Sequence, residues 1–402
     1  MPAGRATLWA GVPFAIHIAA LAAVYALSPW RPAFDDAFHI PDGIRWMQEA
    51  TLPADGLFLR APLWPIVLGT HFSAFGVRTG LFLLQAWIVL ASIVGFLAYS
   101  ERAKGARSSG RTRGSIYPWV IPLGLFAISP QLVLYSRHAV NELWIGLLAV
   151  GVMLLGQRLN GPRAAAMGAA VAAAGMTKIV GFSLIAPALC TLALLPKSRL
   201  RFAGLFALGF VAIAGPLYAL HVSQHGTWLL DNTGAYQLSN FTLREWRQID
   251  GAEPRYAAGL ASGWDFMRAD PGGYLASFLN RSVLWIARPS SADFASFFPN
   301  YPHTLVRVAD GFVFLSLGLL AAMGTTRRNA PIWLFVLAIW LASSFPLHTP
   351  YTPKLILLFP WLLLAPGGIT RLLDWARTRK AGSRSGPQPS ATAEPAPAGD
   401  DR

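Results

Sequence analysis

The sequence predicts an all-α membrane protein that crosses the bilayer about ten times. Of its 402 residues, 54% are hydrophobic and only 13% are charged, whereas a soluble domain carries about 25% charged residues. The mean hydropathy is +0.44, and apolar runs near the length needed to cross a bilayer, about 20 residues, recur along the chain. The net charge of +14 is explained by lysines and arginines in cytoplasmic loops, so we expect no nucleic-acid partner.

The first apolar run covers residues 7–30. It lacks a small-residue cleavage site and is therefore predicted to be a retained signal-anchor helix. The single cysteine, Cys190, excludes an intrachain disulfide. The other runs predicted to cross are 79–100, 115–134, 142–157, 164–177, 181–196, 202–222, 303–325, 331–347 and 353–373.

A further run at 61–76, "APLWPIVLGTHFSAFG", is short and contains two prolines. If it crossed, the basic loop 101–114 would lie outside, but if it does not cross, every compact basic cluster lies inside. We therefore predict an interfacial or re-entrant helix at 61–76, with both termini in the cytoplasm. The clusters that then lie inside are 101–114, 156–163, 197–201, 325–329 and 377–386.

With the basic clusters placed inside, the chain divides into one transmembrane domain, residues 1–376, and a cytoplasmic tail, residues 377–402. The tail is low in complexity and is predicted to be disordered. Two larger segments fall outside: a first outer loop at 31–78, with interfacial helices, and a long outer segment at 223–302. In the latter, residues 266–291 read as an amphipathic helix at the interface.

Two adjacent acids, Asp35 and Asp36, follow the first helix in "FDDAFH". One interpretation is a solvated loop. The other is a general base, which must be positioned against the proton it accepts and kept ionised. Two neighbouring carboxylates raise one pKa unless a cation or donor stabilises them. Spacing alone leaves both interpretations open.

A third acid, Glu142, begins a predicted span in "SPQLVLYSRHAVNELW". An acidic side chain at the end of a membrane span needs either a charged partner or a water-filled cavity. It either forms an ion pair with nearby Arg137, next to His138, or supplies a second carboxylate to a site with Asp35.

Isolated cations lie in the other outer turns. Lys178 stands between two apolar helices, and Arg60 precedes the 61–76 run. Each either snorkels to the interface or binds a phosphate as a point charge. The proline-rich turn "FPLHTPYTPK" carries His348, Tyr351 and Lys354. It is either a simple connection or a rigid ligand-contacting loop.

The order of these motifs resembles the GT-C membrane glycosyltransferases, which use polyprenyl-phosphate sugars. Similar patterns occur in protein O-mannosyltransferases, lipid A aminoarabinose transferases and sugar transferases of lipopolysaccharide cores. The resemblance covers most of residues 7–373. Its motifs are "FDDAFH", "RAPLWPIVLGTHFSAFG", the "SP…YSR…E" segment, "GMTKIVG", "GPLYALHVSQHG" and "HTPYTPK".

This resemblance implies an inverting transfer of sugar from a polyprenyl-phosphate donor to a lipid, glycan or protein acceptor. The site would face the periplasm of a bacterial inner membrane. Asp35 would be the base and Asp36 the second acid. Glu142 would either bind a divalent ion such as Mg²⁺ or Mn²⁺ together with Asp35, or orient the acceptor. Relatives often carry Tyr where this chain has His39, and Arg where it has Pro350. The substrate-binding candidates are His39, Arg60, Arg137, His138, Lys178, His348, Tyr351 and Lys354.

Three other functions fit a polytopic protein. A flippase or transporter would carry ionisable residues within its spans and a weak internal repeat. A lipid-linked glycan ligase would rely on arginines and a histidine in a late loop. A non-catalytic assembly protein would need none of these residues. Only the glycosyltransferase makes Asp35 indispensable.

Overall fold

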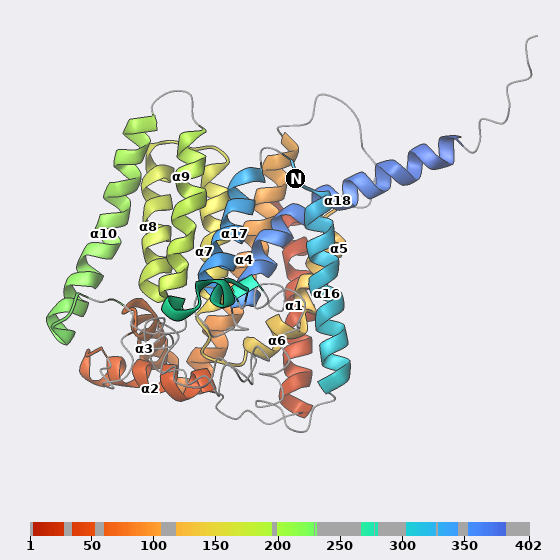
Figure 1. Ribbon diagram of the computed structural model, residues 1–402. Helices are drawn as coiled ribbons and strands as arrows, with labels where there is room; N and C mark the ends of the chain where they lie inside the picture. The colour runs from red at the N-terminus through yellow and green to blue at the C-terminus, as the bar shows by residue number, and fades with distance from the viewer. Residues whose placement is uncertain are drawn as a thin grey trace, which may run out of the picture.

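Most of the residues that the computed structural model describes are helical, as predicted, and there is no strand among them (Figure 1). The chain is an all-α protein with several long apolar helices. The described residues are 3–27, 34–52, 60–105, 118–194, 199–228, 230, 267–276, 278–279, 303–326, 329–344 and 353–382.

A helix lies in each of the predicted apolar runs. Among the described residues, four windows are long and apolar enough to cross a membrane alone: Val77–Ser100, Arg199–His225, Thr304–Met323 and Leu355–Arg379. The other apolar helices are shorter, and the number of spans stays a prediction. The helices are α1 (Ala3–Leu27), α4 (Val77–Gly105), α7 (Glu142–Gly156), α8 (Gly161–Thr177), α9 (Ile185–Ala193), α10 (Arg199–His225), α16 (His303–Met323), α17 (Ala330–Ser344) and α18 (Pro353–Gly382).

The run at 115–134 is broken in the structure. It forms α5 (Val120–Ala127) and α6 (Pro130–Tyr135), separated at Ser129, whose φ of −54° and ψ of 121° are not helical. Pro130 follows directly, and the residue before a proline avoids the α region. After α6 the chain stays irregular until α7, which leaves the backbone of residues 138–140 without helical partners.

Two helices, α2 (Phe34–Glu49) and α3 (Leu63–Phe75), lie together at one end of the bundle (Figure 1). They pack closely because glycines face each other: a Cβ on Gly69 would lie 2.6 Å from the Gly43 oxygen. The 61–76 run therefore forms a helix, and Gly76, with a φ of 74°, turns the chain into α4. Whether α3 lies at the membrane interface stays a prediction.

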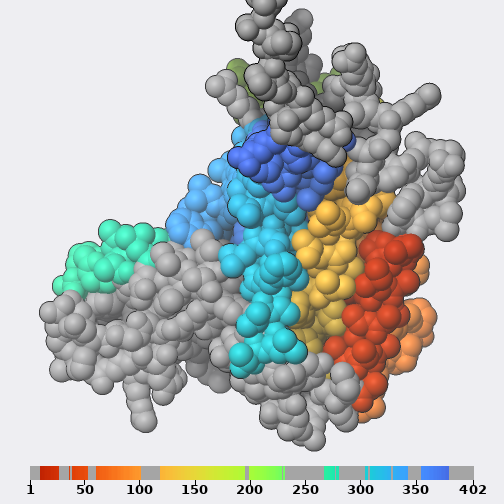
Figure 2. Space-filling model, turned by 90° about the vertical axis from the view of Figure 1, so that its right-hand side faces the viewer, coloured from red at the N-terminus to blue at the C-terminus, as the bar shows by residue number. Residues whose placement is uncertain are grey.

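The α8–α10 pair is built on small residues. A Cβ on Gly168 would lie 2.0 Å from the Phe206 oxygen, and one on Gly209 would lie 2.0 Å from the Ala165 oxygen. Small residues let two helix backbones approach closely. A similar contact joins α16 and α18, where a Cβ on Gly368 would meet the Leu320 oxygen at 2.2 Å. Figure 2 shows the dark-blue end of α18 lying across the top of the cyan helix α16.

Two predicted boundaries can be compared with the structure. Helix α18 continues to Gly382, so the predicted tail is helical over its first residues, and the rest of it lies outside the described residues. The predicted interfacial helix at 266–291 is described only at 267–276 and 278–279. There Asp270 Oδ1 accepts a hydrogen bond of 2.8 Å from the Gly273 N–H, as a helix N-cap does.

Candidate functional site

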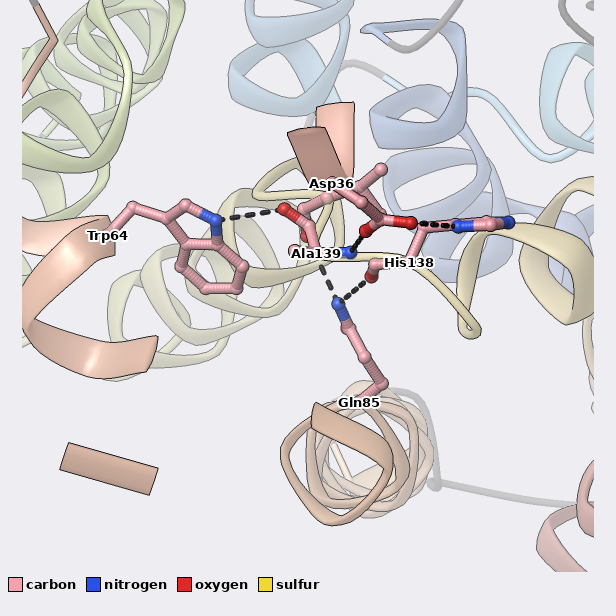
Figure 3. Close-up of polar contacts among 6 residues, drawn as sticks. Asp36, Trp64, Gln85, His138 and Ala139 are labelled. Carbon is pink, nitrogen blue, oxygen red and sulfur yellow. Dashed lines mark hydrogen bonds and ion pairs between the residues drawn. The ribbon is translucent and has the colours of Figure 1, made fainter. Parts of the chain in front are cut away.

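A buried carboxylate, Asp36, joins α2 to the irregular segment between α6 and α7. Its Oδ1 accepts a 2.6 Å hydrogen bond from the Ala139 N–H, and its Oδ2 lies 2.5 Å from His138 Nδ1 (Figure 3). Only 1% of Asp36 is exposed. Because both oxygens are engaged, Asp36 orients this segment rather than presenting an unoccupied basic oxygen.

The same segment is held from α3 and α4. Trp64 Nε1 donates to the Ala139 oxygen at 3.0 Å, and Gln85 Nε2 donates to the His138 oxygen at 2.7 Å (Figure 3). Gln85 Nε2 also lies 3.3 Å from the Val140 oxygen. Buried backbone groups outside a helix need such partners. Side chains from three helices therefore fix the backbone of residues 138–140 in one position.

A buried arginine, Arg137, lies next to this segment. Its guanidinium carbon is 4.6 Å from the centroid of the Tyr25 ring of α1, a cation–π distance. Only 1% of Arg137 is exposed. The arginine thus ties the end of α1 to the same end of the bundle as Asp36.

The third predicted acid, Glu142, is held by a distant lysine. Lys178 Nζ lies 2.6 Å from Glu142 Oε1, with the glutamate side chain 1% exposed and the lysine side chain 33% exposed. Arg137, which the sequence offered as a partner, instead stacks on Tyr25. Glu142 stands in the first turn of α7, where the helix dipole also stabilises a negative charge.

A tight turn places Lys178. The residue has an extended backbone, with φ −161° and ψ 140°, and closes α8. A 3₁₀ helix, Ile179–Leu184, follows it. A Cβ on Gly181 would lie 2.1 Å from the Ala174 oxygen, so a side chain there would push the turn open. Glycine at 181 therefore sets the position of the lysine against α7.

A second ion pair, between Asp42 and Arg60, was missed by the sequence reasoning. Asp42 is 4% exposed and pairs with Arg60 in the segment before α3. A signal was present, because positions 35, 39 and 42 share one stripe of α2 at the i, i+4, i+7 spacing of a helix. Trp64, Gln85 and Tyr25 were also missed.

The imidazole of His39 lies within electrostatic reach of both cations. Burial, and then the charges of Arg60 and Lys178, hold the pKa of His39 well below its usual value. Its Nδ1 is a buried atom with no hydrogen-bond partner. A neutral imidazole can exchange hydrogen bonds with a ligand without adding charge. His39, Arg60 and Lys178 therefore belong to one region of the site.

The expected divalent ion stays a prediction, because the side chain of Asp35, one of its two expected ligands, is not described. Among the described residues, no group of three or more His, Cys, Asp or Glu side chains is arranged to hold a metal. The candidate ligand oxygen of Glu142 is paired with the ammonium of Lys178, and a metal would have to displace that cation.

Four of the predicted residues fall wholly or partly outside this description. The backbones of Asp35 and Lys354 lie in α2 and α18, but their side chains are not described. His348 and Tyr351 lie outside the described residues. One further acid, Asp310 of α16, is 1% exposed, and a buried acid in an apolar helix is a candidate functional residue.

Comparisons with known proteins find no matching family model and no matching curated protein. Among solved structures, the chain is similar to ArnT from Cupriavidus metallidurans bound to undecaprenyl phosphate, with a TM-score of 0.41 and 16% identity over 96% of this chain and 82% of that one. The apo state of ArnT matches with a TM-score of 0.42 and 15% identity, over 94% and 79%. ArnT is a GT-C aminoarabinose transferase, of the class that the motif order resembles. The function proposed below rests on the chain's own residues.

Proposed function

We propose that this protein is an inverting GT-C glycosyltransferase of a bacterial inner membrane. It moves a sugar from a polyprenyl-phosphate donor to an acceptor on the periplasmic face. The observation that carries the proposal is that two cations, Arg60 and Lys178, are each paired with a buried carboxylate. Both cations also lower the pKa of His39 on helix α2. A phosphate leaving group needs cations beside it, and a general base needs an ionised carboxylate near the acceptor.

Asp35 is the proposed base. Its neighbour Asp36 spends both oxygens on Ala139 and His138, which supports a division of roles between the two acids. As the acceptor oxygen or nitrogen attacks the anomeric carbon, Asp35 takes the acceptor's proton. The bond between that carbon and the phosphate oxygen breaks, and the polyprenyl phosphate leaves with the electron pair.

Arg60 and Lys178 are the proposed phosphate-binding residues. Negative charge grows on the leaving phosphate, and preorganised cations stabilise it in the transition state. Asp42 and Glu142 hold these cations in place before the donor arrives. A third of the Lys178 side chain is exposed, so this residue is more accessible than its partner Glu142. His39 is proposed to add a neutral hydrogen bond, and Lys354 a further cation.

The side of the membrane follows from charge. The starts of α8 and α10 and the end of α18 carry arginines and lie at the end of the bundle away from α2 and α3 (Figure 1). The positive-inside rule assigns that end to the cytoplasm. The proposed site at the α2 and α3 end then faces the periplasm. Both termini are proposed to lie on the cytoplasmic side. Assembly of lipopolysaccharide or another envelope glycan is the proposed context.

The test is transfer of labelled sugar from a panel of polyprenyl-phosphate sugars in membranes with matched expression. Wild type is expected to consume one donor, and Asp35→Asn to lose transfer by about 100-fold or more. Glu49→Gln, at the exposed end of the same helix, is the control and should keep wild-type transfer. Full transfer by Asp35→Asn, or none by folded wild type with any donor, would overturn the proposal.

A further inference from the structure

The last part of α18 leaves the bundle. Side chains are buried or half-buried up to Thr370, and those of 371–379 are exposed, apart from half-buried Leu373. Pro366, Gly367 and Gly368 immediately precede the change. Figure 1 shows this blue end of α18 projecting from the helices beside it, at the end opposite α2 and α3. The projecting part is called the α18 extension, residues 371–382.

The extension begins where the membrane should end. The helix from 353 to 370 rises about 27 Å at 1.5 Å per residue, which nearly spans a hydrocarbon core of about 30 Å. Arg371 Nη2 donates a 2.8 Å hydrogen bond to the Thr325 oxygen, in the turn after α16. This contact ties the start of the extension to the turn after α16.

The extension exposes apolar side chains: Leu372 and Trp375 are exposed among the described residues, whereas Leu373 packs partly against the hydrophobic core of the bundle. At 100° per residue, Leu372, Leu373 and Ala376 fall on one stripe with Trp375 at its edge, and Asp374 and Thr378 fall opposite. Two cations fall within the same stripe, Arg379 between Leu372 and Trp375 and Lys380 between Ala376 and Leu373. Leu372 is 38% exposed and Trp375 is 55% exposed.

The charge of the extension indicates which surface these exposed side chains contact. It contains four cations, Arg371, Arg377, Arg379 and Lys380, and one acid, Asp374. The Arg379 guanidinium lies 4.3 Å from the Trp375 ring centroid, which puts a cation beside the apolar edge. The extension lies at the bundle end where α8 and α10 begin, and those starts are also basic. An anionic surface complements both features.

We propose that the α18 extension is an interfacial helix that binds the anionic phospholipid headgroups of the leaflet on the basic side. Leu372 and Trp375 enter the boundary between headgroups and acyl chains, as the apolar face of an amphipathic helix does. The arginines contact lipid phosphates. This surface lies at the opposite end of the bundle from the proposed transfer site and does not depend on it.

The test uses the full chain in vesicles of phosphatidylcholine, with or without phosphatidylglycerol. Cys190→Ser combined with Ala376→Cys allows one environment-sensitive fluorophore on the apolar face. With phosphatidylglycerol we expect a blue shift and quenching by brominated acyl chains, both reduced by salt. Each cation removed should weaken this partitioning by about fivefold, so Arg377→Gln with Arg379→Gln should abolish most of the difference between the two lipids.

Arg377→Lys with Arg379→Lys is the matched control, since it keeps both charges, and it should behave as wild type. Size-exclusion elution of each variant monitors its fold. Equal quenching in neutral and anionic vesicles, or an unchanged response in the Gln variant, would overturn the proposal. A water-exposed label in both vesicles would show that the extension faces solvent or an acidic protein instead.

Discussion

The two ends of the bundle treat charge in opposite ways. At the end with α2 and α3, the charged side chains of Asp36, Asp42 and Glu142 are buried, and each has a basic partner. At the other end, the arginines of the α18 extension are exposed. A buried charge must be paired, because desolvation costs several kcal/mol per ion. Buried ion pairs therefore hold the side chains of the candidate site in position. Exposed cations are the residues from which the positive-inside rule predicts the membrane topology.

The largest effect is expected from Asp36→Ala. The change leaves the Ala139 N–H and His138 without their carboxylate partner in a buried place, which should cost about 3 kcal/mol. Thermal unfolding in detergent should therefore occur at a lower temperature, and sugar transfer should fall because residues 138–140 lose their anchor. Glu49→Ala on the exposed end of α2 is the control. An unchanged unfolding temperature for Asp36→Ala would show that the buried pairing does not organise this end.

The next effect concerns Lys178→Met, which leaves Glu142 buried and uncompensated. Breaking a buried pair costs about 3–5 kcal/mol, but partial exposure of the lysine reduces this to about 2 kcal/mol. Adding Glu142→Gln should restore most of the stability. If Lys178 also binds phosphate, the double variant should regain stability but not transfer, as thermal melts and a donor titration would show. Recovery of both would limit the lysine to a structural role.

A smaller effect follows from His39, whose pKa in the folded protein lies below its usual value of 6.5. The unfolded state then binds more protons between these two pKa values, so stability falls as pH drops below about 6.5. His39→Gln should remove this part of the pH dependence, while stability at pH above about 7 changes little. Melting temperatures across this pH range provide the measurement. Identical pH slopes in both proteins would contradict the pKa assignment.

The smallest effect is expected at the exposed end, for Asp374→Asn. The Arg377–Asp374 pair is 3.3 Å long, with side chains 54% and 63% exposed. An exposed pair three residues apart on a helix contributes about 0.5 kcal/mol or less. The melting temperature should therefore remain within error of wild type. A loss comparable to that of Lys178→Met would mean that the extension is buried in the folded protein.

Part of the candidate site was predictable because it follows from local chemistry. Paired acids after the first apolar run, and cations in outer turns, are visible in the sequence as residues in costly places. Asp42 could have been found from the helical spacing of positions 35, 39 and 42. The contacts of Asp36 were not predictable, because its partners Ala139 and His138 lie about a hundred residues away in the sequence.

The amino-acid order alone was sufficient for the helical class and for the apolar runs, whereas the placement of the basic loops in the cytoplasm stays a prediction. These properties depend on the local balance of apolar and charged residues against the bilayer. Pairing required the folded bundle. Glu142 meets Lys178, 36 residues away, rather than Arg137, five residues away. The reason is that α7 packs on α8, which places the start of α7 with Glu142 beside the end of α8 with Lys178. The Arg137 guanidinium instead stacks on the Tyr25 ring.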